Sequence, residues 1–241
     1  MKIVFSRKGF DSSAGGGPSP IVDGVPVTLP IPAYGTMSNR SYRDLGLHEH
    51  AAVASRGRVC ADDLCHHDPM FLPGGQAMLG QVGAAQSHLE GQGVGPGDVF
   101  LFFGLFREGS ARLHHRIFGC MTVERVRAVA DLQPQEVDEL RALGMPHAFG
   151  AHGPNDTLWQ GPGRMARAAS DALRLTVAEG PPSLWTVPPW LGQVGLTYHR
   201  KAERWLPDNR LQSAPRGQEF VADIGNRADA RAWLDGILSA I

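Results

Sequence analysis

The sequence has 241 residues, of which 42% are hydrophobic, which is enough to bury a core without disulfides. The formal net charge is -1, so the chain lacks the overall positive excess that drives non-specific binding to phosphate backbones, and any nucleic-acid contact must be local. No run approaches the roughly 20 apolar residues of a membrane span, and no signal-peptide pattern follows Met1. Three cysteines fit a reducing compartment, so we expect a cytoplasmic protein without a membrane partner.

The first hundred residues predict mainly strands and loops, with one clear helix. Residues Lys2 to Phe5 predict a buried strand, and a polar, glycine-rich loop follows from Ser6 to Pro20. The alternating residues of Ile21 to Ile31 predict a hairpin about their Asp-Gly pair. The stretch from Pro32 to Pro73 lacks periodicity, which predicts irregular structure with one short helix. Apolar residues at helical spacing predict a helix from Gln76 to Gln92.

The rest of the chain mixes strand and helix signals without regular alternation, which argues against a doubly wound parallel sheet. The predicted strands are Val99 to Phe106, returning antiparallel strands within Leu113 to Val129, Leu173 to Val177, Leu196 to His199, and one around Phe220. The predicted helices are Gln135 to Leu143, with Pro134 in its first turn, and Ala228 to Leu238. We therefore predict one α+β domain over residues 1–241, with a mixed, mainly antiparallel sheet or partial barrel flanked by helices.

Two segments resemble the core hairpin of PUA-like domains, including the ASCH and EVE branches. They are GPGDVFLFFG, in which a Gly-Asp turn begins a strand, and IFGCMTVERV, which returns beside it. More of the chain is similar to a single family, through SRKGFDSSAGG, GQVGAAQSHL, GPGDVFLFFGLFR, SLWTVPPWL, LTYH and RGQEFV. Together these motifs resemble the third nucleotide-modification-associated domain family, although Leu105 and Thr197 replace the Trp and Ser of that pattern.

The resemblance implies a bacterial and phage family that accompanies DNA-base hypermodification systems. Its implied partners are a nucleotide or nucleic acid and other proteins of such a system. It names neither a reaction nor a cofactor, and the sequence alone assigns no cofactor.

The early loop has the composition of an anion-binding site. Backbone N–H groups of Gly15 to Gly17 could hold a phosphate, and Asp11 could act as a base or a metal ligand. The loop lacks a Walker or dinucleotide fingerprint, so a flexible surface loop is the alternative that composition favours, and only the resemblance favours function. Its candidate substrate-binding residues are Arg7, Lys8, Ser12 and Ser13.

The second candidate site is late in the chain, in the segment RGQEF. Arg216 and Gln218 are candidate substrate-binding residues, and Glu219 is a candidate catalytic carboxylate that stabilises positive charge or activates a hydroxyl. The alternative is a surface Arg-Glu pair worth at most about 1 kcal/mol. His199 is a candidate acid or base, although a single strand histidine is more often structural.

Polar residues on the predicted helix could read a base. Gln81 and His88 are seven residues apart and would share a helix face, with Gln86 offset, but ordinary helix glutamines explain them equally well. We also include Arg107 among the candidate substrate-binding residues.

Histidines and cysteines between positions 48 and 68 raise the question of zinc. The candidates are His48, His50, Cys60, Cys65, His66, His67 and Asp68. No second pair completes a zinc site, so a polar loop is the preferred interpretation and we assign no metal ligand. The resemblance implies an Asp-Pro here, through which Asp68 could still join a site.

These observations favour an enzyme that modifies a nucleotide or nucleic-acid base, in a DNA-modification or defence system. The alternatives are a non-catalytic PUA-like reader of modified bases and an assembly subunit. An enzyme should bring Arg7, Asp11 and Glu219 together. A reader needs an aromatic-walled pocket with few ionisable groups, and a subunit needs an exposed apolar patch.

Overall fold

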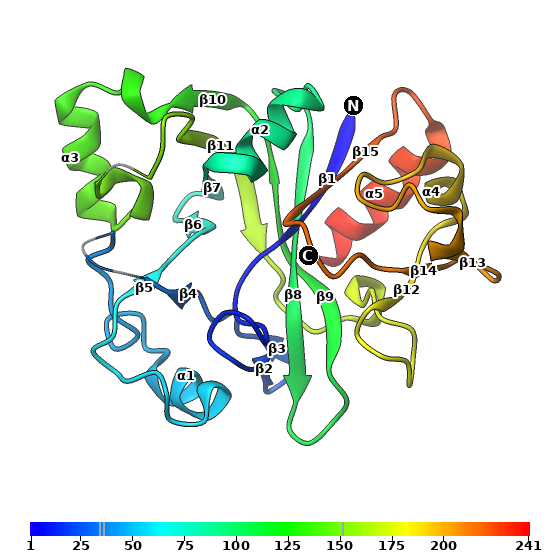
Figure 1. The fold of residues 1–241 in the computed structure, drawn as a ribbon, viewed down its shortest axis with the longest axis horizontal. Helices are drawn as coiled ribbons and strands as arrows, with labels where there is room; N and C mark the ends of the chain where they lie inside the picture. The colour runs from blue at the N-terminus through cyan, green and yellow to red at the C-terminus, as the bar shows by residue number, and fades with distance from the viewer. Residues whose placement is uncertain (34, 36, 151) are drawn as a thin grey trace.

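The computed structural model describes residues 1–33, 35, 37–150 and 152–241 (Figure 1). Its main sheet has the strand order β15-β1-β8-β9-β11-β7-β6, to which β10 and the β2–β3 hairpin attach. The bounds of these strands are β1 Lys2–Arg7, β2 Ser19–Val22, β3 Val25–Pro26, β6 Met70–Leu72, β7 Gln76–Gln81, β8 Val99–Glu108, β9 His114–Thr122, β10 Arg125–Ala128, β11 Thr157–Met165 and β15 Glu219–Asp223.

Helices and smaller sheets surround this sheet. The helices are α1 His48–Ser55, α2 Gly83–Gly91, α3 Pro134–Leu143, α4 Pro189–Val194 and α5 Ala228–Ala240, and the 3-10 turns are η1 Val129–Asp131, η2 Pro146–Ala148, η3 Asp171–Leu173 and η4 Ala202–Arg204. The remaining strands are β4 Ile31–Pro32, β5 Cys65–His66, β12 Leu184–Thr186, β13 Trp205–Leu206 and β14 Arg210–Gln212. Figure 1 shows α3 to the left of the main sheet, and α4, α5 and β12–β14 to its right. Among the described residues, no helix combines the length and apolar character needed to cross a bilayer.

Strand β8 lies at the centre and is buried on both faces. It pairs parallel with β1 and antiparallel with β9. Its residue Phe103 packs with Trp185 on one face, whereas Phe100 packs with Trp159 on the other. Successive side chains of a strand point to opposite faces of the sheet, so a strand that is covered on both faces needs a nearly continuous run of apolar residues. The residues from Val99 to Phe106 form such a run.

The sheet curls until strands from distant positions approach each other. Four strands separate β15 from β7 in the sheet order, yet Gln81 at the end of β7 donates a hydrogen bond to Glu219 at the start of β15. No ladder joins β7 to β15 in the described part of the chain, so the sheet stays open. The predicted α+β class with a mixed, mainly antiparallel sheet is confirmed. Its relation to PUA-like domains stays a prediction.

Most of the elements expected from the sequence are confirmed. The first strand, the early hairpin, the strand from Val99, its antiparallel partner and the last two long helices are all present. The expected irregular region from Pro32 to Pro73 contains α1 and the short strands β5 and β6, and its positions 34 and 36 lie outside the described residues.

The helix expected from Gln76 to Gln92 is wrong in its first half. Residues Gln76–Gln81 form β7, which pairs with β11 on one side and β6 on the other. Gly83, at φ +65°, then begins the shorter helix α2. Strand pairing with distant residues overrides the helical spacing of the apolar side chains.

Two expected strands are also wrong. Residues 173 to 177 make only isolated bridges, Arg116 with Arg174 and Thr176 with Trp185. Residues 196 to 199 form a turn, because Tyr198 adopts φ +66°, which a strand cannot contain. Leu173, Leu175 and Leu196 are buried in the core although no regular ladder includes them.

Candidate functional site

A cavity of about 480 Å³ opens where the curled sheet brings its strand ends together. Six segments of the chain line it: the loop after β1, β4, the β5 region, the end of β7, the η2 region and the loop before β15. The lining residues include Arg7, Lys8, Asp11, Ser13, His66, Asp68, Gln81, His147, His152, Arg216 and Gln218.

One wall is organised by a buried carboxylate. The side chain of Glu219 is 0% exposed, and its Oε1 accepts hydrogen bonds from Ser6 Oγ at 3.0 Å, Lys8 Nζ at 3.1 Å and Gln81 Nε2. Its Oε2 is buried without a partner among the described residues. The register of the sheet causes this meeting, because Ser6 of β1 lies directly opposite Glu219 of β15. Glu219 thus holds two cavity-lining side chains, Lys8 and Gln81, from beneath.

Arg7 and Asp11 both line the cavity, but each has structural partners. The Arg7 guanidinium donates to the carbonyls of Ala214 and Pro215, at 2.9 and 3.2 Å, and so fixes the loop before β15. Burial lowers the pKa of Arg7, and the charge of Asp11 offsets only part of that effect. Asp11 Oδ1 accepts from the backbone and hydroxyl of Ser13, both at 2.7 Å, and from the Ala14 N–H.

The three glycines expected to hold a phosphate do not line the cavity. Gly16 donates its N–H to the Asp11 carbonyl, within the loop itself. A Cβ on Gly15 would strike the buried ring of Phe10, and one on Gly17 would lie 2.1 Å from the carbonyl oxygen of Ala54 in α1. These glycines allow close packing outside the cavity lining, and the phosphate-cradle interpretation of this run stays a prediction.

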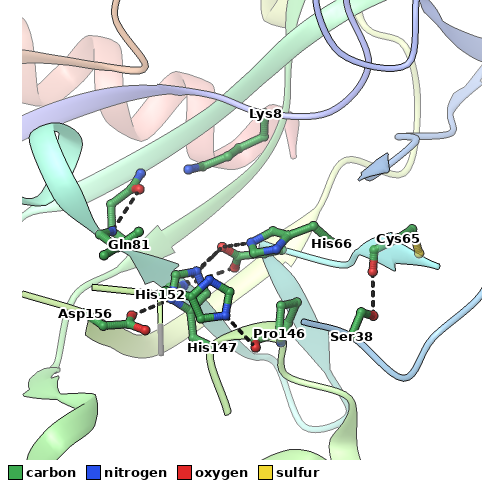
Figure 2. A network of polar contacts seen from close by, with 12 residues as sticks. Lys8, Ser38, Cys65, His66, Gln81, Pro146, His147, His152 and Asp156 are labelled. Carbon is green, nitrogen blue, oxygen red and sulfur yellow. Dashed lines mark hydrogen bonds and ion pairs between the residues drawn. The ribbon is translucent and has the colours of Figure 1, made fainter. Parts of the chain in front are cut away.

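The facing wall carries a cluster of histidines and aspartates. His66 Nε2 lies 3.8 Å from Asp68 Oδ2, and His147 Nε2 lies 3.9 Å from the same oxygen. His147 Nδ1 makes a short hydrogen bond with Asp156 Oδ1, and the His152 ring stacks on His147 with centroids 4.5 Å apart. Figure 2 shows the histidines gathered on the side of the cavity that faces Lys8 and Gln81.

Local backbone features position this cluster. The N–H of Gly80 donates to both oxygens of Asp68, at 3.1 and 3.2 Å. Gly80 also has to lack a side chain, because a Cβ there would lie 2.0 Å from Cδ2 of His147. Burial alone would raise the pKa of Asp68, but His66, His147 and Lys8 outweigh it and hold that pKa below its ordinary value.

The remaining candidate residues lie away from the cavity lining or have structural partners. His199 is fully buried, its Nδ1 donates to the Thr197 carbonyl and its Nε2 accepts from the Ala214 N–H. Burial lowers its pKa to about 4, so it is a neutral structural group near pH 7. Gln86 accepts from Trp159 Nε1 and donates to Glu90.

Three other candidates also lie outside this lining. His88 bonds to Thr197 Oγ1 and lines a separate hollow with Tyr198. Arg107 lines another hollow, beside α1, and Ser12 is exposed. The helix face expected to join Gln81 to His88 does not exist, because Gln81 belongs to β7.

Sequence reasoning missed His147, His152 and Asp156. The first two lie in and after the turn η2, where no periodic pattern marks them. The only available signal was the spacing of two histidines and one aspartate within ten residues, which is common in loops.

The fold and cavity define an α+β protein with a pocket of ionisable side chains at the open end of a curled sheet. The chain belongs to the family described as nucleotide modification associated domain 3, which matches residues 2–223. No curated protein and no solved structure matches the chain. Family membership connects the chain with nucleotide modification.

Proposed function

We propose that this chain is an enzyme that modifies a nucleotide or a nucleic-acid base in the cavity between Lys8 and His147. The chemistry of the lining supports this proposal most. The described lining residues include two arginines, a lysine, two aspartates and three histidines, but no Phe, Tyr or Trp. A reader holds a flipped-out base between aromatic or apolar walls, whereas proton transfer needs ionisable groups beside the substrate.

The first wall of the cavity, which carries Lys8, Arg216 and Gln218, suits the phosphate of a nucleotide. Arg216 and Gln218 are exposed on the loop before β15, and no described residue shares a hydrogen bond with the Arg216 guanidinium. A guanidinium presents a planar fork of donors that matches a phosphate. Lys8 adds a further hydrogen-bond donor at the same wall, with its charge paired to Glu219. Because the chain is nearly neutral overall, the local charge of Arg216 is what would attract an anionic substrate.

The second wall supplies ionisable groups. His66, Asp68, His147 and His152 line the cavity opposite Lys8, so groups capable of acid-base or ligand chemistry lie beside a base or sugar held by the first wall. Glu219 becomes a positioning residue in this scheme, because its buried carboxylate acts through Lys8 and Gln81. Asp11 shapes the loop that closes the cavity.

The test compares, by mass spectrometry, nucleosides from the DNA, the RNA and the free nucleotide pool of cells that carry the protein with those of cells that carry an empty vector. The setting that we propose for the activity is a DNA-modification or defence system. The proposal predicts a nucleoside of altered mass that depends on the protein. Identical nucleoside profiles, together with selective binding of the purified protein to modified oligonucleotides, would instead indicate a reader.

A further inference from the structure

Three ligand atoms converge on the second wall of the cavity. His66, Asp68 and His147 each offer one ligand atom, and these three atoms all lie within 4.8 Å of one another. The two nitrogen-to-oxygen distances, 3.8 and 3.9 Å, are too long for hydrogen bonds. The two histidine nitrogens therefore lie close to Asp68 Oδ2 without forming hydrogen bonds to it.

The spacing is close to that of ligands around one cation. Two ligands bound at about 2.1 Å in tetrahedral geometry lie about 3.4 Å apart. Each imidazole nitrogen would therefore need to approach Asp68 Oδ2 by only about 0.5 Å. The side chains of Asp68 and His147 are each 3% exposed, and His66 is 22% exposed, so the site is sheltered but reachable from the cavity.

Surrounding groups already orient the ligands. An ionised Asp156 can only accept a hydrogen bond, here from His147 Nδ1–H, so a neutral His147 presents the lone pair of Nε2 toward Asp68. A carboxylate behind a ligating histidine is the usual second layer of a metal site. The Gly80 N–H in turn fixes the Asp68 carboxylate.

We propose that His66, Asp68 and His147 bind one divalent transition-metal cation, with at least one coordination position open to the cavity. Two imidazoles and one carboxylate suit zinc, iron, cobalt or manganese better than magnesium, which prefers oxygen ligands. Three protein ligands with an open position are typical of catalytic rather than structural sites. The proposal adds a metal site to the function proposed above. It can be tested independently of that function, because metal affinity is measured without any substrate.

The test is titration of the purified, chelator-stripped protein with Co²⁺ and Zn²⁺. Calorimetry measures the binding of both ions, and visible absorption detects bound Co²⁺. We expect one equivalent bound, with Mg²⁺ failing to compete. His66→Ala and Asp68→Asn should each lower the affinity at least tenfold, and Asp156→Asn should lower it about 10- to 100-fold through the orientation of His147. Thermal unfolding of each variant checks that it is folded.

His50→Ala is the matched control, because His50 lies on α1 outside this cluster and should leave both stoichiometry and affinity unchanged. Two results would overturn the proposal: no binding by the wild-type protein, or binding that His66→Ala and Asp68→Asn leave intact. A protein that binds no metal but still alters nucleosides would refute only this site. Metal binding without altered nucleosides would refute only the enzymatic proposal.

Discussion

Gln81 and Glu219 are 138 positions apart in the sequence, yet Gln81 Nε2 donates a hydrogen bond to Glu219 Oε1. The same oxygen accepts from Ser6 and Lys8, so one buried carboxylate joins the ends of β1, β7 and β15. This meeting determines which segments surround the cavity. It also makes the wall sensitive to changes that do not touch the substrate.

The Lys8–Glu219 pair should show strong energetic coupling. Lys8→Met leaves the carboxylate of Glu219 buried without its cation, and we expect a loss of about 3–5 kcal/mol in the free energy of unfolding. The double variant Lys8→Met/Glu219→Gln should recover most of that loss, because it removes both charges. Urea denaturation of the two single variants and the double variant measures the coupling. Simple addition of the two single losses would show that the pair is not coupled.

Gly80→Ala should disturb the second wall specifically. The added methyl group overlaps the His147 ring, so we expect a loss of about 1–3 kcal/mol in stability and weaker metal binding. Gly91→Ala is the control, because nothing lies within 4 Å of its added Cβ at the end of α2. That control should keep or slightly raise the unfolding temperature. Equal behaviour of the two variants would contradict the packing of His147 on Gly80.

Arg216→Ala should weaken substrate binding without destabilising the fold. Because Arg216 is exposed, its loss should leave the unfolding free energy within about 0.5 kcal/mol of wild type. Losing a charge-assisted bond to phosphate should lower nucleotide affinity about tenfold or more. Calorimetric titration with nucleoside monophosphates checks this, with the exposed Arg167→Ala as control. Equal affinities for the two variants would place the phosphate elsewhere.

His199 should make stability depend on pH. Its folded-state pKa is about 4 and its ordinary value is 6.5, so the unfolded chain binds the proton first as pH falls. Stability should therefore be complete above pH 6.5 and decline toward pH 4, by up to about 3 kcal/mol from this group. His199→Gln should flatten the decline, although His115, with a pKa lowered to about 3, keeps part of it. Urea denaturation across this range measures both slopes, and equal slopes would contradict the assignment.

The sequence predicted those parts of the fold whose signal is local. A strand such as β8, buried on both faces, must be an apolar run, and Pro134 marks the start of α3. By contrast, β7 exists because β6 and β11 lie on either side of it, and no local pattern carries that information. Tyr198 likewise needs a left-handed backbone that a strand-like sequence does not indicate.

The site was predicted in the same uneven way. Arg7, Lys8, Asp11 and Arg216, which come from motifs at the two ends of the chain, line one cavity, and their roles stay predictions. His147 and Asp156 could not be connected with Asp68, because that contact depends on how η2 packs against Gly80 of β7. Long-range packing, rather than residue type, decides which histidines face the cavity.

The most direct test of a catalytic cavity compares nucleosides from cells that express the wild type, Asp68→Asn or Asp62→Asn. Asp68 faces the cavity, whereas Asp62 is exposed and pairs with Arg43, so the two substitutions are chemically matched. The account predicts an altered nucleoside with the wild type and Asp62→Asn that disappears with a folded Asp68→Asn variant. Indistinguishable nucleoside profiles for the wild type and Asp68→Asn would contradict it.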